Sequence, residues 1–210
     1  MSVALRVEVP IASFRQSRAR EYAETYAAPP PATVYGMLLS LVGETDRYRY
    51  LGSRLAIGLL SRPQRSTVVR TFRRYKKKDI ADASNARPDY QALLAGVQLA
   101  VWLSPGQCEA DPALPDRVRT ALDRPDEIER FGGLCLGESH DLVDTVEYLP
   151  AEDASVRPQW LEQDADGLLT LPVWVDHVGS QRTRWRRFSL ADPAAQHEPP
   201  ETAWVAIQRD

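Results

Sequence analysis

The chain has 210 residues, of which 43% are hydrophobic and 26% charged, and its formal net charge is −3. This length and composition are typical of one soluble globular domain with a sizeable core and room for a small additional unit. No run of about 18 apolar residues occurs, so no transmembrane helix is expected. Arg6 and Glu8 interrupt any signal-peptide core, so we expect the cytoplasm as location and no membrane partner.

The first 45 residues predict a strand followed by a helix. Apolar side chains occupy every second position at the start, a period typical of a half-buried strand. The expected buried face consists of Val3, Leu5, Val7, Val9 and Ile11. After a polar loop, PPPATVYGMLLSLVG (residues 29–43) predicts a helix. Prolines suit its first turn, apolar residues recur at helical spacing, and Gly43 can end it.

Residues 54–78 predict a long β-hairpin. SRLAIGLLS (53–61) reads as its first strand, RPQRS (62–66) can turn the chain, and TVVRTFRRY (67–75) is rich in β-branched and aromatic residues. The outer half has too few apolar residues to be core on both faces, so we expect it to project from the body. The polar residues that follow, 79–90, are typical of a loop.

The next elements complete an α+β plan. Residues 97–103 alternate like a strand, 114–122 repeat like a short amphipathic helix, and 143–149 form another strand after a glycine turn, FGGLCLGES (131–139). The order β-α-β-β-α-β is that of the ferredoxin-like fold. We therefore expect a ferredoxin-like domain over residues 1–150, with the hairpin 54–78 projecting from it.

Residues 151–210 predict a C-terminal β extension and tail. An acidic linker leads into an alternating strand, LLTLPVWVDHV (168–178), which returns as RTRWRRFSL (182–190). The residues AAQHEPPE (194–201) read as a loosely held tail. The returning strand carries a second basic cluster around Trp185, a weaker signal because it is short and because tryptophan is more often a core residue.

Charge is segregated along the chain. Residues 1–80 hold 15 basic and 6 acidic side chains, whereas residues 81–210 hold 11 and 23. Within the first part, RPQRSTVVRTFRRYKKK (62–78) has eight cations and no acid, while a solvated face usually mixes both signs. Phe72 and Tyr75 interleave with the charges, as stacking side chains do in single-strand sites. The pattern favours nucleic-acid contact over a localisation signal. The candidate cations are Arg62, Arg65, Arg70, Arg73, Arg74, Lys76, Lys77 and Lys78.

Catalytic and metal signals are sparse. Neither the two cysteines nor the three histidines have zinc-ligand spacing, and no compact set of carboxylates suits two magnesium ions, so no metal or cofactor is expected. One enzymatic alternative stays open: a metal-independent endoribonuclease with His140 as general acid or base and Asp141 orienting its ring.

Several of these segments together resemble a known family. The first strand leading into SFR, the proline-rich helix entry, the basic hairpin, VWL and the glycine turn CLGES resemble the fifth family of CRISPR-associated proteins. These are the Cas-five subunits of type I Cascade complexes, within the RAMP superfamily. The resemblance spans residues 1–190. The hairpin 62–78 matches the family's thumb, residues 30–43 its first helix, and Gly133 to Ser139 its glycine turn.

The resemblance implies a subunit at one end of a guide-RNA complex. It would hold the 5′ handle of the guide RNA, cap the backbone subunits through the thumb, and meet the large subunit, with target DNA an indirect partner. Arg15, Arg18 and Gly137 would join the hairpin cations in RNA binding. Some relatives cleave precursor RNA with a Tyr/Lys/His set, but the only lysines here lie in the hairpin, which favours a non-catalytic role. A protein-binding scaffold, whose hairpin inserts into an acidic partner, is the third alternative.

Overall fold

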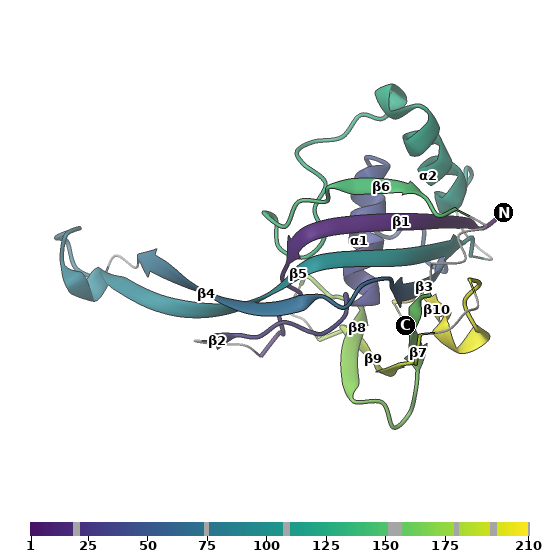
Figure 1. Ribbon diagram of the computed structural model, residues 1–210. Helices are drawn as coiled ribbons and strands as arrows, with labels where there is room; N and C mark the ends of the chain where they lie inside the picture. The colour runs from purple at the N-terminus through teal and green to yellow at the C-terminus, as the bar shows by residue number, and fades with distance from the viewer. Residues whose placement is uncertain are drawn as a thin grey trace.

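The computed structural model describes residues 1–18, 22–73, 76–106, 110–150, 157–178, 181–193 and 197–209, with only the backbone at Phe72 and Arg73. Figure 1 shows a twisted sheet with a long projection at one side. The strands are β1 (Val3–Ala12), β2 (Tyr22–Ala23), β3 (Arg54–Leu59), β4 (Gln64–Arg73), β5 (Ala86–Ser104), β6 (Thr145–Tyr148), β7 (Gln159–Gln163), β8 (Leu169–Trp174), β9 (Arg184–Leu190) and β10 (Val205–Ala206). The helices are α1 (Pro31–Leu41) and α2 (Leu114–Asp123), with short 3-10 turns at Ala83–Asn85, Pro125–Glu127 and Glu201–Ala203.

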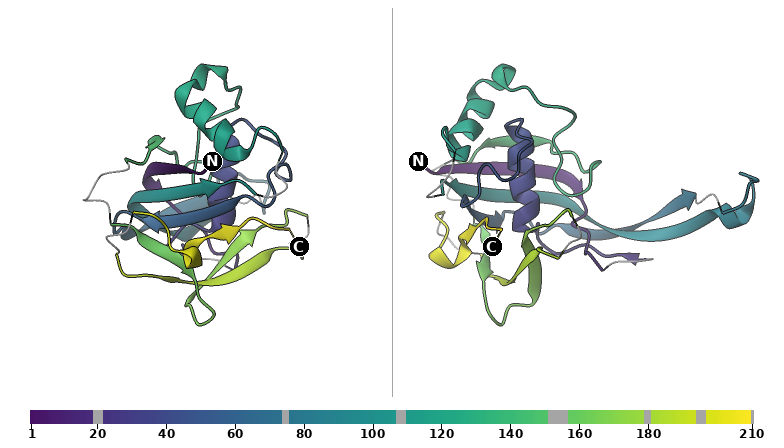
Figure 2. Two further views of the ribbon diagram at one scale, coloured as in Figure 1. Left: turned by 90° about the vertical axis from the view of Figure 1, so that its right-hand side faces the viewer. Right: turned by 180° about the vertical axis from the view of Figure 1, so that it is seen from behind.

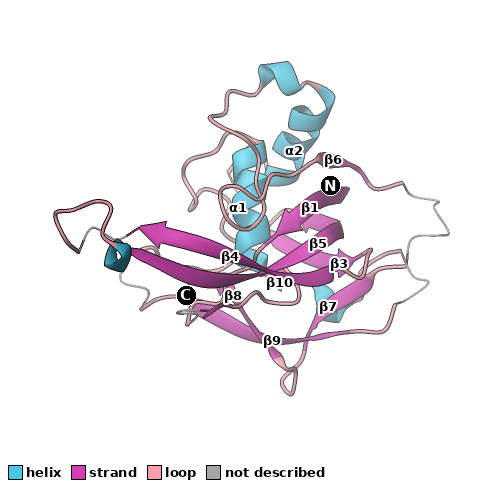
Figure 3. Cartoon of the chain, turned by 60° about the vertical axis from the view of Figure 1, so that its left-hand side comes forward, coloured by secondary structure: helices cyan, strands magenta, loops and turns pink. Residues whose placement is uncertain are grey.

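The core sheet has the order β6-β1-β5-β3, with every neighbouring pair antiparallel. Helix α1 connects β1 to β3, helix α2 connects β5 to β6, and both pack on the same side of the sheet (Figure 3). The α+β class predicted from the sequence is therefore confirmed. Within the described ranges, no helix is long and apolar enough to cross a bilayer.

The alternation in β1 has the predicted effect up to Val9. Val3, Leu5, Val7 and Val9 are each at most 4% exposed. Ile11, predicted to share their face, is instead 50% exposed. It lies near the end of β1, beyond Leu5–Glu8, the part of the strand that β6 flanks. The prediction failed because periodicity marks a face of a strand but not how far its neighbours extend.

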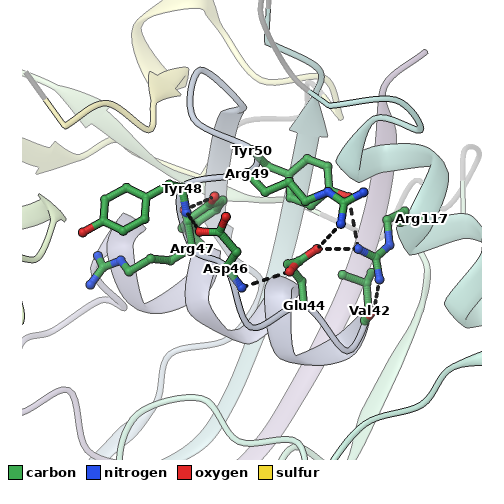
Figure 4. Close-up of polar contacts among 9 residues, drawn as sticks. Val42, Glu44, Asp46, Arg47, Tyr48, Arg49, Tyr50 and Arg117 are labelled. Carbon is green, nitrogen blue, oxygen red and sulfur yellow. Dashed lines mark hydrogen bonds and ion pairs between the residues drawn. The ribbon is translucent and has the colours of Figure 1, made fainter.

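A charged cluster joins the ends of the two helices (Figure 4). Glu44 follows α1, and its carboxylate accepts hydrogen bonds from Arg117 of α2 at 2.7 Å and from Arg49 at 3.3 Å. Arg117 also donates to the Val42 carbonyl and, at 3.1 Å, to the Tyr50 hydroxyl. The glutamate side chain is only 8% exposed, so these partners replace the water that its charge loses on burial.

The predicted hairpin 54–78 is wrong in its pairing. Strand β4 pairs with β5, from Gln64↔Ala95 to Arg73↔Ala86, and not with β3. Strand β3 pairs with β5 further along, to Leu59↔Leu99, so β3 and β4 follow each other beside one long partner. The expected turn at 62–66 only bends the chain, where Ser61 Oγ donates to the carbonyl of Gly96 at 2.7 Å.

The projecting hairpin consists of β4 and the first half of β5 (Figures 1 and 2). Residues 86–90, predicted as loop, belong to β5. Near the tip, buried Asn85 accepts hydrogen bonds from the backbone amides of Lys76 at 2.9 Å and Lys77 at 3.1 Å, and donates to the Asp79 carbonyl at 2.7 Å. One side chain thus organises the turn, which explains why this polar sequence is ordered between two strands.

The C-terminal residues extend the sheet. The predicted strands 168–178 and 182–190 are present as β8 and β9, which pair antiparallel. Strand β7, not predicted, joins β3 to β9. The predicted loose tail, residues 194–201, lies partly outside the described residues, and the ordered residues after the 3-10 turn at Glu201–Ala203 were not predicted. Val205 pairs with Leu55 of β3, and Ile207 is fully buried. The reason is the apolar alternation of Ala203, Val205 and Ile207, which the preceding prolines obscured.

Candidate nucleic-acid interface

A groove lies where the projecting hairpin joins the body. Two cavities of about 690 and 370 Å³ share the lining residues Ser17, Tyr26 and Trp185, so they form one continuous groove. Its walls come from the segment after β1, from the first residues of β4, and from the β8–β9 hairpin. Arg18 and Arg65 line the larger cavity, and Arg15 lines the smaller one.

The segment after β1 folds back on itself and so presents its arginines. The backbone of Arg15 bridges to Thr25, and the amide of Tyr26 donates to the carbonyl of Phe14 at 2.8 Å. The Phe14 amide donates to the Thr25 hydroxyl at 2.9 Å, and the phenyl ring of Phe14 is buried in the core. With Phe14 anchored inside, the side chains of Arg15 and Arg18 remain exposed.

The glycine turn forms a further wall of the smaller cavity. The buried carboxylate of Asp141 accepts from the amides of Ser13 and Glu138, both at 2.8 Å, and so ties the turn to the end of β1. Gly137 lines the cavity and has φ +122°. A Cβ there would lie 2.6 Å from the Asp141 carboxylate and 2.9 Å from the Ser13 carbonyl. Glycine is therefore required by this close approach, whatever ligand the groove takes.

Two aromatic side chains line both cavities. Trp185, on β9, is 40% exposed although its indole is among the largest apolar surfaces available to a core. Burial raises the pKa of the Tyr26 phenol, against smaller opposing contributions from Ser17 and Arg18. The phenol is therefore neutral at physiological pH and can donate a hydrogen bond. A groove with cations and aromatic faces can hold phosphates and stack bases.

The structure brings together only part of the predicted set. Arg15, Arg18, Arg65 and Gly137 meet at the groove, although they come from three separate parts of the sequence. Arg62 is exposed in the connection between β3 and β4 and lines neither cavity. Arg74 and Tyr75 lie outside the described residues, as do the side chains of Phe72 and Arg73.

The three lysines lie in the connection from β4 to β5, which is the far end of the projecting hairpin (Figure 1), and they do not line the groove. Lys76, Lys77 and Lys78 are all exposed, and Lys77 forms an ion pair with Asp82 at 3.1 Å. The basic stretch therefore spans two surfaces, one at the base of the hairpin and one at its tip. Sequence proximity alone suggested a single surface.

Arg70 and His140 form a contact between the hairpin and the glycine turn. The guanidinium of Arg70 lies 2.6 Å from Nε2 of His140 and 3.4 Å from the Glu138 carboxylate. Because arginine only donates, Nε2 is the acceptor of this hydrogen bond. The adjacent Asp141 carboxylate is 3.5 Å from the same nitrogen. Among the described residues, no group of three or more His, Cys, Asp or Glu side chains could hold a metal ion.

Sequence reasoning missed Tyr26 and undervalued Trp185. Tyr26 follows an arginine-containing loop, a weak hint, but only the fold places it beside Trp185, more than 150 residues later in the chain. The acids that partner the hairpin cations were also invisible from the local sequence. Glu138 and Asp82 lie outside the stretch that they partly neutralise.

The fold is shared with CRISPR-associated proteins. It is similar to a chain of a CRISPR RNA-guided surveillance complex, with TM-score 0.64 and 15% identity over 91% of this chain and 89% of that one. It is also similar to a structure described as a Cas protein, with TM-score 0.52 and 15% identity over 100% of this chain and 96% of that one.

Comparisons of the sequence identify one family among the CRISPR-associated proteins. The model of the family described as CRISPR-associated protein (Cas_Cas5) matches residues 2–162. The CRISPR-associated protein Cas5 of Myxococcus xanthus (strain DK1622) is 43% identical over an alignment of 199 residues that covers 93% of this chain and 93% of that protein. The chain therefore belongs to the Cas5 family of CRISPR-associated proteins, and the resemblance noted in the sequence is confirmed.

Proposed function

We propose that this Cas5 protein is an RNA-binding subunit of a type I CRISPR interference (Cascade) complex and that its groove holds the 5′ handle of the guide RNA. The observation that carries the proposal is the convergence of Arg15, Arg18 and Arg65 on one groove with two aromatic walls. Family membership and the fold shared with a chain of an RNA-guided surveillance complex support the same setting.

The chemistry of the groove suits single-stranded RNA. Guanidinium groups contact phosphate oxygens in a forked geometry and stay charged at any physiological pH. Arg18 lies in the segment after β1 and Arg65 lies on β4, so a phosphodiester backbone that crosses the larger cavity would meet cations from two separate elements. The exposed faces of aromatic side chains accept unpaired bases with little sequence preference.

The projecting hairpin would serve a second partner. We propose that the β6-β1-β5-β3 core is a ferredoxin-like module and that the β4–β5 hairpin is its thumb, which packs on the adjacent backbone subunit. Val69 and Tyr90 face each other across the hairpin and are 61% and 49% exposed, an unusual pair of apolar side chains for a surface that meets only water. Contact with the large subunit and an indirect contact with target DNA belong to the same proposal.

The proposed role is non-catalytic. His140, the candidate acid or base, already accepts a hydrogen bond from Arg70 through Nε2 and is exposed at the hairpin side of the glycine turn. The lysines that could stabilise a developing phosphate charge lie at the hairpin tip. These positions support an RNA-holding role over cleavage.

The proposal is tested by charge reversal in the groove. Handle RNA with a fluorescent label is titrated with the parent protein and with the Arg18→Glu, Arg65→Glu double variant. We expect the variant to bind at least tenfold more weakly, because two phosphate contacts are replaced by repulsion. The matched control is Arg124→Glu, Arg130→Glu, which makes the same charge change at two exposed positions outside the groove. Equal weakening by both pairs would contradict a specific groove.

A further inference from the structure

The C-terminal hairpin supplies one whole side of the groove. The family model ends at residue 162, whereas β8 and β9 span residues 169–190. Leu169, Thr170 and Trp185 line the larger cavity, and Pro172, Thr183 and Trp185 line the smaller one. One side of the groove is therefore closed by the β8–β9 hairpin, which lies beyond the region matched by the family model.

This hairpin is anchored and does not form a loose flap. Its Trp174 is buried, and the guanidinium of Arg47, in the segment after α1, lies 3.9 Å from the centre of the indole ring. Tyr48 packs against the same ring at 5.6 Å between centroids. On β9, Arg184 donates to the carbonyl of Arg209 at 3.1 Å. The wall thus has a fixed position relative to α1 and the C-terminal residues.

Trp185 stands out on this wall. It projects from a strand whose neighbours Arg184, Arg186 and Arg187 are also exposed, and its partner on β8 is Pro172. Its indole lines both cavities, so it lies at the point where they join. An exposed tryptophan at a cationic groove is unfavourable in water alone and favourable when a flat ligand covers it.

The cations on the two sides of Trp185 suggest the ligand. Arg18 and Arg65 line the larger cavity, and Arg15 lines the smaller one, so phosphates can be held both before and after the indole. The smaller cavity, about 370 Å³, has the size of a small-ligand site, and its walls include the hydroxyl-bearing Thr33 and Thr183. A single-stranded nucleic acid with one base turned inward presents such an arrangement, because a backbone phosphate lies on each side of the nucleoside that carries the base.

We infer that Trp185 is the stacking platform for one unpaired nucleobase of the guide RNA and that the β8–β9 hairpin is the second wall of the RNA groove. The inference rests on the proposed function and adds a specific contact from outside the family-matched region. The base stacks on the indole, and the flanking phosphates lie toward Arg15 on one side and toward Arg18 and Arg65 on the other.

The test compares Trp185→Ala with Trp185→Phe in handle-RNA binding. Loss of one stacked base should weaken binding of Trp185→Ala roughly five- to hundredfold, while Trp185→Phe keeps an aromatic face and stays within about threefold of the parent. Because no charge changes, the salt dependence should remain that of the parent. Phe131→Ala is the control, since Phe131 is fully exposed and lies outside the groove.

A second readout covers the case in which Trp185→Ala fails to fold. RNA binding should quench tryptophan emission of the parent and leave that of Trp185→Phe almost unchanged, because none of the other four tryptophans, Trp102, Trp160, Trp174 and Trp204, lines the groove. Where Trp185→Ala does fold, replacing handle bases one at a time by abasic nucleotides should reveal one position that weakens RNA binding by the parent but not by that variant.

The outcomes separate the two proposals. If the parent binds RNA and the groove arginines matter, but Trp185→Ala binds within twofold and Trp185→Phe is quenched like the parent, the stacking inference is wrong and the groove stands. If the parent does not bind handle RNA, both proposals fail. If RNA affinity is intact and Trp185→Ala instead loses binding to a neighbouring subunit, Trp185 contacts protein and the inference is overturned.

Discussion

Two arginines on one strand illustrate how the fold divides a basic sequence. Arg65 is opposite Leu94 and Arg70 is opposite Asp89, so their side chains leave opposite faces of the hairpin. Arg65 reaches the groove, whereas Arg70 contacts Glu138 and His140 of the glycine turn. The same residue type, five positions apart, therefore serves ligand binding at one site and internal packing at the other.

Asp141 is the residue that fixes the walls of the smaller cavity. Asp141→Ala removes the acceptor of two amides, those of Ser13 and Glu138, which then lie without a partner near the core. We predict a loss of about 2–4 kcal/mol in the free energy of unfolding, measured by urea denaturation. Asp141→Asn keeps one oxygen that can accept both hydrogen bonds and should lose about 1 kcal/mol or less. Equal losses in Asp141→Ala and Asp141→Asn would contradict a role for the side-chain oxygen of residue 141 as acceptor.

A cleavage assay with the parent and His140→Ala distinguishes the RNA-holding role from the nuclease alternative. Purified protein incubated with precursor repeat RNA in EDTA should give no site-specific product, because Nε2 of His140 is engaged by Arg70 and no lysine lies at the turn. The His140→Ala variant should behave identically, as seen by gel analysis of the RNA. Specific cleavage by the parent that disappears in His140→Ala would establish the enzyme instead.

At the scale of elements, the strand pattern was predictable but its pairing was not. The sequence correctly indicates that residues 54–59 and 67–73 are extended, because β-branched, aromatic and alternating residues favour strands. It does not say that both segments pair with β5, since pairing depends on residues that are distant along the chain. Residues 62–66 were therefore predicted to reverse the chain direction, whereas they only bend it.

The exposed apolar pair Val69 and Tyr90 on the hairpin should bind a protein partner. Val69→Asp places a charge beside Tyr90 in an exposed apolar pair, and we predict at least tenfold weaker association with the backbone subunit, measured by biolayer interferometry. Handle-RNA affinity of the isolated subunit should change less than twofold, because Val69 does not line the groove. Ser66→Asp adds the same charge to an exposed position on the opposite face and serves as control. Unaltered association of Val69→Asp would contradict a docking role.

The junction of α1 and α2 should make stability sensitive to acid. Burial alone would raise the pKa of Glu44, but hydrogen bonds from the Asp46 amide and Arg117 and the charges of Arg49 and Arg117 outweigh it and lower the pKa below its ordinary value of 4.5. A lowered pKa in the folded state stabilises the fold above pH 4.5, and this contribution is lost as the pH falls below that value.

The matching variant is Glu44→Gln, which has no ionisable carboxyl at that position. The difference in unfolding free energy between parent and variant should be constant from pH 5.5 to 7, to within about 0.3 kcal/mol, and should shrink steadily below the ordinary value of 4.5. Denaturant titrations at several pH values measure it. A difference that grows on acidification would mean that the glutamate is buried in its neutral form.

For the whole molecule, local patterns specify the layers but not the site. The strand β1, both helices and the β8–β9 hairpin follow from periodicity and turn residues. The groove does not, because Arg15, Arg65 and Trp185 meet only after strands far apart in the sequence have paired. Strand β7 and the buried tail were missed for a similar reason, since short apolar segments are stabilised by neighbours and not by their own propensity.

The structure shows where the basic and acidic side chains of the two parts of the sequence lie. Arg15, Arg18 and Arg65 of the first part lie at the groove and the three lysines at the hairpin tip, while other arginines, such as Arg47 and Arg54, lie over tryptophan rings of the body. Glu138, an acid from the second part, lines the smaller cavity and limits its positive field. Binding of an anion at the groove should therefore depend on a few defined contacts and not on the net charge of the protein, which is −3.

The salt dependence of handle-RNA affinity tests the central claim most directly. Each phosphate contact with a single strand contributes about 0.7 to the slope of log affinity against log salt concentration. Neutralising the three groove cations as Arg15→Gln, Arg18→Gln, Arg65→Gln should make the slope shallower by about 2, and the same substitutions at Arg124, Arg130 and Arg157 should leave it unchanged. A parent slope near zero, or equal changes in both triple variants, would contradict RNA binding at this groove.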